Sequence, residues 1–219
     1  MKSVRTSYLG QSGLVRGESS TADWSADSTD VFLPVGFEKN YAYPVLIWLD
    51  SEEGCRGEFQ LRMEAISERN YVGIRFPVLE GASGELRLEE IPRAVHMVSR
   101  YANLHSERIY LCGERHYASL ALQHVLAEPG KFGGFVAVAP VSLSVNISLG
   151  NFRQLKHLRG LFLERRGGVS SVSSLASLLH ASGIEIRQQE YPDEEQATSG
   201  GIINRFLMQG ILREQMRKT

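Results

Sequence analysis

From Val31 onward, short apolar runs alternate with longer stretches in which apolar residues recur at helical spacing. The run from Val45 to Leu49 is continuously apolar, which is typical of a strand covered on both faces. Further strands are predicted at residues 71–76, 108–112, 134–138, 160–163 and, as an alternating edge strand, 184–189. Helices are predicted from about Pro92 to Tyr101 and at residues 116–127, 172–181 and 201–216.

This alternation predicts the α/β class, with a mostly parallel sheet and helices on both of its faces. We expect one domain over residues 29–219. Residues 1–28 are rich in Ser, Thr, Gly and Asp without a clear period, and are predicted to form a flexible or edge-packing arm with Trp24 as its candidate anchor. Ligands of such sheets bind beyond the carboxyl ends of the strands, so functional residues are expected just after each strand.

The composition narrows the functional classes. The chain has 219 residues, of which 42% are hydrophobic and 22% charged, and this suits one compact domain. A formal net charge of -1 gives no electrostatic reason to expect nucleic acid or an anionic membrane as partner. The N-terminus has no apolar signal-peptide core, and no stretch is long enough to span a bilayer. A cytoplasmic protein without a membrane span is therefore the favoured interpretation.

The two cysteines, Cys55 and Cys112, lie far apart in the sequence and match no metal-ligand spacing. A lone disulfide remains an alternative, but two buried reduced thiols in a cytosolic protein is the favoured interpretation. The sequence carries no cofactor motif either, so neither a cofactor nor a metal is expected.

One stretch has a specific chemical pattern. The buried strand at 108–112 ends in Gly113, and a helix that begins with small residues, Ala-Ser-Leu-Ala-Leu-Gln at 118–123, follows after a short turn. Here the chain resembles the α/β-hydrolase superfamily, in particular its small phospholipase/carboxylesterase-like branch, in which a G-x-S-x-G elbow follows this strand. The resemblance covers roughly residues 30–212 and implies a single-domain α/β-hydrolase-like fold without a large lid.

The resemblance aligns the nucleophile elbow with Gly113, Glu114, Arg115, His116 and Tyr117. Arg115 stands where the family has its serine, and a guanidinium stays protonated and cannot act as a nucleophile. The second glycine of the motif is replaced by Tyr117. The elbow is therefore predicted to keep its architecture without its chemistry.

The other catalytic positions that the resemblance implies also depart from the family pattern. The last histidine of the chain is His180, before the last strand, whereas the family's base lies in the loop after it. The residues that stand at the positions of the base, the acid and the oxyanion loop are Asp193, Glu194 and Glu195; Glu164, Arg165 and Arg166; and Asp50, Ser51 and Glu52, respectively. Acidic groups at the oxyanion loop would repel a developing negative charge. The catalytic triad is therefore predicted to be absent.

Residues 50–52, 113–117, 164–166 and 193–195 together form the expected active-site rim. Arg115 on this rim has two interpretations. Beside a helix N-terminus, and with Arg165 and Arg166 nearby, it would bind an anion such as a phosphate or carboxylate. The favoured alternative is an internal ion pair with one of the acidic residues of the neighbouring loops, which are Asp50, Glu52, Glu53, Asp193, Glu194 and Glu195.

The sequence leaves three functions open. The favoured hypothesis is a catalytically degenerate α/β-hydrolase-fold protein, a pseudo-esterase, with a binding or scaffolding role through the rim; its partner would be an anionic small molecule or another protein. The first alternative is an unconventional carboxylic-ester or phospholipid hydrolase. The second is a structural protein whose helices or residues 1–28 form the contacts of a homo-oligomer. A label of hydrolase from the fold alone would not establish activity.

Overall fold

The computed structural model describes residues 13–16, 30–51, 53–78, 90–141, 153–166, 172–192 and 196–218. Its strands are β1 (Gly13–Arg16), β2 (Asp30–Leu33), β3 (Tyr43–Ser51), β4 (Val72–Val78), β5 (Leu104–Glu114), β6 (Gly134–Val138), β7 (Arg159–Arg165) and β8 (Glu185–Tyr191). Its helices are α1 (Arg56–Ile66), α2 (Ile91–Ser99), α3 (His116–Ala127), α4 (Ser173–Ala181) and α5 (Gln196–Lys218), with short 3-10 helices η3 (Pro129–Lys131) and η5 (Leu155–His157).

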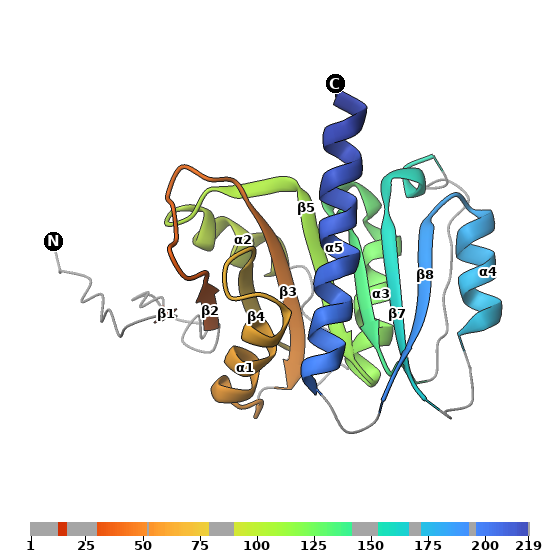
Figure 1. The fold of residues 1–219 in the computed structure, drawn as a ribbon, viewed down its shortest axis with the longest axis horizontal. Coiled ribbons are helices and arrows are strands. Elements are labelled where there is room, and N and C mark those ends of the chain that lie inside the picture. The colour runs from red at the N-terminus through yellow and green to blue at the C-terminus, as the bar shows by residue number, and fades with distance from the viewer. Residues whose placement is uncertain are drawn as a thin grey trace, which may run out of the picture.

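All eight strands belong to one sheet in the order β1-β2-β4-β3-β5-β6-β7-β8. Strand β2 runs antiparallel to both of its neighbours, and the strands from β4 to β8 are parallel to one another. Because the parallel strands run in the same direction, the carboxyl ends of β3, β5, β7 and β8 lie along one edge of the sheet, at the bottom of Figure 1. The prediction of a mostly parallel sheet is confirmed.

Two hydrophobic clusters cover the two faces of this sheet. On one face, the strands pack against α1 and α5, through side chains such as Phe59 and Phe206. On the other face they pack against α2, α3 and α4, through Ala94, Leu122 and Leu179. Figure 1 shows α1 and α5 in front of the sheet and α3 behind it. Successive residues of a strand point to opposite faces, so the covered part of β3, from Val45 to Leu49, has apolar residues at every position, as its continuous apolar run indicated.

The predicted helices and strands after residue 40 are all present, with ends that differ by a few residues. The main difference is α1, which the sequence did not indicate as a helix. Only Phe59, Met63 and Ile66 of this helix are buried, while Leu61 is exposed, so its apolar face is narrow and its period weak. Its place depends on close packing with α5, where a Cβ on Gly200 would collide with the carbonyl of Ala65.

Within the predicted N-terminal arm, residues 13–16 form β1 at the edge of the sheet, paired with β2. The remainder of residues 1–28, including the candidate anchor Trp24, lies outside the described residues. In the part of the chain that the structure describes, none of the helices is both long and apolar enough to cross a bilayer.

Candidate functional site

The turn between β5 and α3 is a single residue wide. Strand β5 ends at Glu114, helix α3 begins at His116, and Arg115 between them has φ 55° and ψ −115°. Residues other than glycine rarely adopt this backbone conformation, which costs on the order of 1–3 kcal/mol of conformational energy. The surrounding backbone fixes it, because the Arg115 N–H donates to the Val138 carbonyl at 2.8 Å. Arg115 thus occupies the tip of a strained strand-to-helix turn.

The absence of a side chain at Gly113 allows the start of α3 to approach the end of β5 closely. A Cβ at Gly113 would collide with the carbonyl of Tyr117 and would lie 2.7 Å from the Ala118 nitrogen. The start of α3 therefore crosses directly over the end of β5, and only a glycine leaves space for it. Tyr117, at the position of the second motif glycine, is half-buried.

The side chain of Arg115 is exposed, and so is that of His116. Of the six acidic residues that were candidate partners for Arg115, Asp50 and Glu53 are described, and neither forms an ion pair with it; the Asp50 carboxylate instead accepts from the Ser51 N–H at 2.8 Å. The other candidates, Glu52, Asp193, Glu194 and Glu195, lie outside the described residues, so the ion-pair interpretation remains a prediction for those four.

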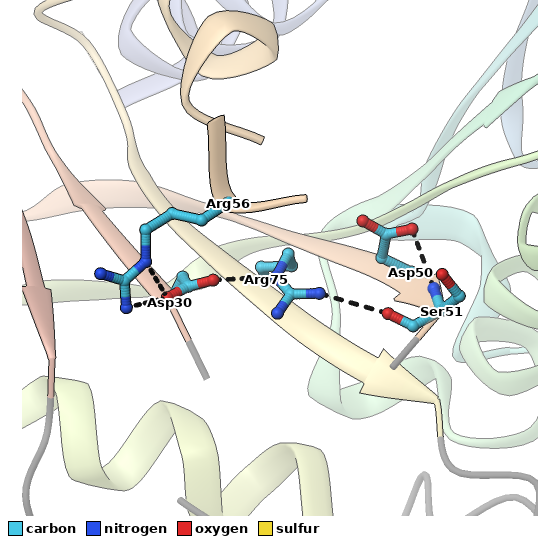
Figure 2. Close-up of polar contacts among 5 residues, drawn as sticks. All are labelled: Asp30, Asp50, Ser51, Arg56 and Arg75. Atoms are coloured by element: carbon cyan, nitrogen blue, oxygen red, sulfur yellow. Dashed lines mark hydrogen bonds and ion pairs between the residues drawn. The ribbon is translucent and has the colours of Figure 1, made fainter. Parts of the chain in front are cut away.

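The end of β3, where the family's oxyanion loop was expected, is held by a buried ion pair between β2 and β4 (Figure 2). Arg75 of β4 donates through Nε to Asp30 at 3.0 Å and through Nη1 to the Ser51 carbonyl at 3.2 Å. Arg56, the first residue of α1, also donates to Asp30, at 2.7 Å. Arg75 and Asp30 are 5% and 3% exposed, and breaking such a buried pair typically costs about 3–5 kcal/mol.

Two predicted rim loops begin later than expected, because their strands extend further. Asp50 and Ser51 are the last residues of β3, and Glu164 and Arg165 are still in β7. Arg166 follows β7 in a turn, and its N–H donates to the Tyr191 carbonyl at 3.0 Å, which ties the end of β7 to the end of β8.

The nearby serine and the cysteines have structural surroundings. The buried Ser119 hydroxyl donates to the Val141 carbonyl at 2.7 Å, as suits a serine that packs a helix against a loop. Cys112 is fully buried, and burial raises the pKa of its thiol well above the usual range, so it is not a reactive thiolate. The expectation of two buried thiols is wrong for Cys55, which is exposed at the residue before α1. Neither cysteine forms a disulfide.

A cavity of about 200 Å³ lies beside the elbow, on the sheet face that α1 and α5 cover. It brings Glu114 of the elbow together with Arg165 of the expected acid loop. Sequence reasoning missed two of its other lining residues, Trp48 and Arg62, and Arg115 is not among the described residues that line it. The signal for Trp48 was an aromatic residue with a polar N–H inside an otherwise aliphatic strand, whereas Arg62 lies on the helix that the sequence did not reveal.

Among the described residues, no three His, Cys, Asp or Glu side chains lie close enough together to hold a metal ion. The described rim carries the guanidiniums of Arg115, Arg165 and Arg166 and an equal number of carboxylates, those of Asp50, Glu114 and Glu164, and a partly open pocket lies beside it.

Comparison with known proteins identifies the fold of the chain. No protein-family model matches the chain, and no curated protein matches it. Among solved structures, a ferulic acid esterase is similar with a TM-score of 0.62 at 11% identity, over 90% of this chain and 98% of that one. FphF, a fluorophosphonate-binding serine hydrolase from Staphylococcus aureus, is similar with a TM-score of 0.59 at 12% identity, over 92% and 99%.

A third similar structure is a CE1 ferulic acid esterase from Anaeromyces mucronatus, with a TM-score of 0.57 at 17% identity over 93% of each chain. At such identities a likeness concerns the fold and not the activity. The chain therefore has the single-domain α/β-hydrolase-like fold that the resemblance in its sequence implied.

Proposed function

We propose that this protein is a catalytically degenerate α/β-hydrolase-fold protein, with a binding or scaffolding role through its former active-site rim. The observation that carries the proposal is the identity of the residue at the elbow tip. Arg115 has the strained backbone conformation that would present a nucleophile, but its side chain is a guanidinium. A guanidinium is protonated at every physiological pH and has no lone pair to attack a carbonyl.

Neither Ser119 nor Cys112, which flank the elbow in the sequence, is suited to replace the nucleophile. Ser119 is buried and its hydroxyl is engaged with a backbone carbonyl. Cys112 is buried, and burial raises the pKa of its thiol, which disfavours the reactive thiolate. His116 is exposed beside the elbow tip, but a general base needs a nucleophile within hydrogen-bond reach.

The exposed arginines of the rim are better suited to binding an anion than to nucleophilic catalysis. Arg115 is exposed at the start of α3, where the free N–H groups of the first turn add partial positive charge. Arg166 is exposed at the end of β7 along the same edge of the sheet. A phosphate or carboxylate, from a small molecule or from the side chain of a protein partner, is the group that such donors recognise.

The loss of catalysis is tested with a fluorophosphonate probe, which labels an activated serine covalently. We expect no labelling and no turnover of short aryl esters, with a serine hydrolase such as FphF labelled in parallel as the positive control. Stoichiometric labelling of this protein would overturn the proposal in favour of the unconventional hydrolase.

Binding at the rim is tested by thermal unfolding in the presence of inorganic phosphate and of short carboxylates. A ligand that binds only the native state raises the melting temperature, and we expect Arg115→Gln to reduce that rise. Arg69→Gln is the matched control, because Arg69 is exposed just before β4, at the amino end of the sheet. Equal rises in the two variants would exclude Arg115 as the anion-binding group. An unaltered melting temperature together with a concentration-dependent oligomer by light scattering would favour the structural alternative.

We further propose the cytoplasm as its compartment. Both thiols are free although Cys55 is exposed to oxidation, and exposed free thiols persist where glutathione and thioredoxin keep them reduced.

A further inference from the structure

The last strand of the sheet, β8, pairs on one side only. It ends the strand order, its partner is β7, and Figure 1 shows it at one end of the sheet. The register with β7 continues without a shift from Glu185 to Tyr191. Proteins usually protect such an edge with a very short strand, a bulge, a proline or a lysine. Strand β8 has seven residues and none of these features, whereas β1, at the other end of the sheet, has four residues.

Three residues of β8 direct their backbone hydrogen-bonding groups away from the sheet. The Glu185 N–H donates toward β7, to the Leu158 carbonyl at 3.2 Å. Because consecutive residues of a strand direct these groups to opposite sides, Ile186, Gln188 and Glu190 direct theirs outward. Within the described part of the chain, these outward N–H and C=O groups form no hydrogen bond. Strand β8 therefore presents a row of unpaired donors and acceptors.

The second half of β8 is open on both faces of the sheet. Gln188, Gln189 and Glu190 are consecutive, and the side chains of all three are exposed. Consecutive side chains point to opposite faces, so the described helices cover neither face at this point. Nearer the start of the strand, Ile186 packs against the hydrophobic cluster that includes Leu179 of α4. The described residues thus leave room for a further strand along the outer edge of β8.

A second copy of the chain complements this edge. Two copies of β8 related by a two-fold axis run antiparallel, and each contact then occurs twice. In the register centred on Gln188, this residue lies opposite itself, and Ile186 lies opposite Glu190 of the other copy. All three outward residues are then paired, and each pair exchanges two N–H···O=C hydrogen bonds.

The charges of β8 are compatible with this register. Arg187 lies opposite Gln189 of the second copy, and no like charges of the strand are directly opposed. The Glu190 carboxylate lies diagonal to the Gln188 amide of the second copy, whose N–H groups donate to such an acceptor.

The neighbouring symmetric registers are less favourable. A register centred on Arg187 or on Glu190 places two like charges directly opposite each other, which is destabilising. A register centred on Ile186 or on Gln189 leaves one of the three outward residues without a partner in the other strand. The pattern of β8 therefore favours a second copy as the occupant of the edge, in one register.

We propose that the protein forms a symmetric homodimer in which β8 pairs antiparallel with β8 of a second copy, centred on Gln188, so that one sheet continues through both copies. Antiparallel pairing places the two active-site rims at opposite edges of this continuous sheet. Arg115 follows β5, in the middle of the strand order, and is not part of the interface. The dimer is therefore independent of the function proposed for the rim.

Sedimentation equilibrium of the full chain measures the association. We expect a reversible dimer with a dissociation constant on the order of 1–100 µM, because a single strand edge is a small interface. Gln188→Pro removes an outward N–H and leaves the hydrogen bonds with β7 in place, so it should weaken the dimer about tenfold or more. Gln188→Thr, which keeps the N–H, is the matched control. A chain that stays monomeric at about 1 mM, or a dimer that Gln188→Pro does not weaken, would overturn the proposal.

Opposite charges at position 188 test the two-fold axis. Gln188→Lys and Gln188→Glu each oppose like charges across the axis, so each variant alone should dimerise about threefold to tenfold more weakly. An equimolar mixture of the two should form the heterodimer preferentially, which native mass spectrometry measures. Gln123→Lys, exposed on α3, is the control for the added charge and should dimerise like the wild type. A mixture without preference for the heterodimer would show that position 188 does not lie on the axis and that the proposal is wrong.

Arg115→Gln separates the dimer from the proposed function. We expect this variant to dimerise like the wild type, whereas its anion binding at the rim would be reduced. A loss of the dimer in Arg115→Gln would make the rim itself the interface and overturn the assignment to β8. Position 188 is exposed, so the Lys and Glu variants should fold even if Gln188→Pro does not, and circular dichroism of all three checks this.

Discussion

At the scale of single residues, the informative feature is the strain at Arg115. The residue has a positive φ of 55° although it is not glycine, and the only other described non-glycine residue with a positive φ is Ala139, just after the neighbouring strand β6. The two are linked through the backbone, since Arg115 N–H donates to Val138 and Ala139 N–H to Leu163. Strained residues persist where the surrounding structure over-determines them, and they concentrate at functional turns. In this protein the strained position carries an arginine, which is uncommon at such a position, and we propose that it is a former nucleophile position.

The strain can be measured by replacing Arg115. Arg115→Gly is expected to raise the free energy of unfolding by about 1 kcal/mol, because glycine adopts φ 55° without steric cost. Arg115→Ala removes the charge but keeps the Cβ, so it should give no comparable gain. Urea unfolding at neutral pH measures both variants. If alanine stabilised the protein as much as glycine, the guanidinium rather than the backbone would be the source of the destabilisation.

At the scale of elements, the junction of β5 and α3 determines where the elbow lies. The strand belongs to the centre of the sheet and pairs with β3 and β6, so its position is fixed on both sides. The helix starts one residue later and packs its buried face against the same sheet. At Gly113, which has no side chain, the backbone of β5 packs directly against the backbone of the first turn of α3. The geometry of the elbow therefore requires glycine at position 113.

Gly113→Ala is expected to destabilise the protein by about 2–3 kcal/mol, since the added methyl group would meet the backbone of Tyr117, which cannot move without shifting α3. Gly201→Ala is the matched control. A Cβ there meets nothing within 4 Å, and the position is helical and exposed, so alanine should stabilise by up to about 1 kcal/mol. Thermal or urea unfolding measures both changes in the free energy of unfolding, which should be a decrease for Gly113→Ala and an increase for Gly201→Ala. A mild effect at Gly113 would mean that α3 tolerates displacement from β5.

At the scale of the whole molecule, helices on both faces of the sheet bury polar groups whose ionisation then depends on folding. His124 near the end of α3 packs edge-on against Phe132, with ring centroids 5.5 Å apart, and its Nε2 is buried without a hydrogen-bond partner among the described residues. Burial lowers the pKa of His124 below its ordinary value. One turn later, the hydrogen bond from Lys131 lowers the pKa of the Glu128 carboxyl.

The two shifts act in different pH windows. Unfolding restores the ordinary histidine pKa of 6.5, so the contribution of His124 is complete above that pH and is lost as the pH falls toward the lower folded-state pKa. The contribution of Glu128 is present above its ordinary pKa of 4.5 and is lost only below it. Of these two groups, only His124 therefore reduces the stability between pH 7 and pH 5.

We expect the melting temperature to fall from pH 7 to pH 5 in the wild-type protein and to fall less in His124→Leu, which keeps a side chain of similar size without an ionisable group. Calorimetric melting at half-unit pH intervals measures the difference. Lys131→Gln should change the profile below pH 5, because it removes the partner of Glu128. It should also make the fall above pH 5 slightly smaller, because the charge of Lys131 contributes to the lowered pKa of His124. An identical fall in wild type and His124→Leu would show that His124 is not the responsible group.

The sequence by itself determined the class of fold and the junction of strand and helix around Arg115. Both depend on local information: continuous apolar runs for covered strands, helical spacing between them, and a glycine before a helix of small residues. It also identified Arg115 as a residue without nucleophilic chemistry, since that follows from the side chain alone. Helix α1 was not predicted, because its apolar face is narrow and packs mainly against α5, so its apolar residues show little helical periodicity in the sequence.

Only the tertiary structure decided what lies beside the elbow. The ion pair of Asp30 with Arg75 requires β2 to pair with β4, and the cavity requires residues as distant as Trp48 and Arg165 to meet on one face. Such contacts depend on strand order and register across the sheet, and the periodicity of a single segment contains no information on either. The strain at Arg115 likewise comes from the strand, helix and neighbouring loop that hold its backbone together, and not from its own preference.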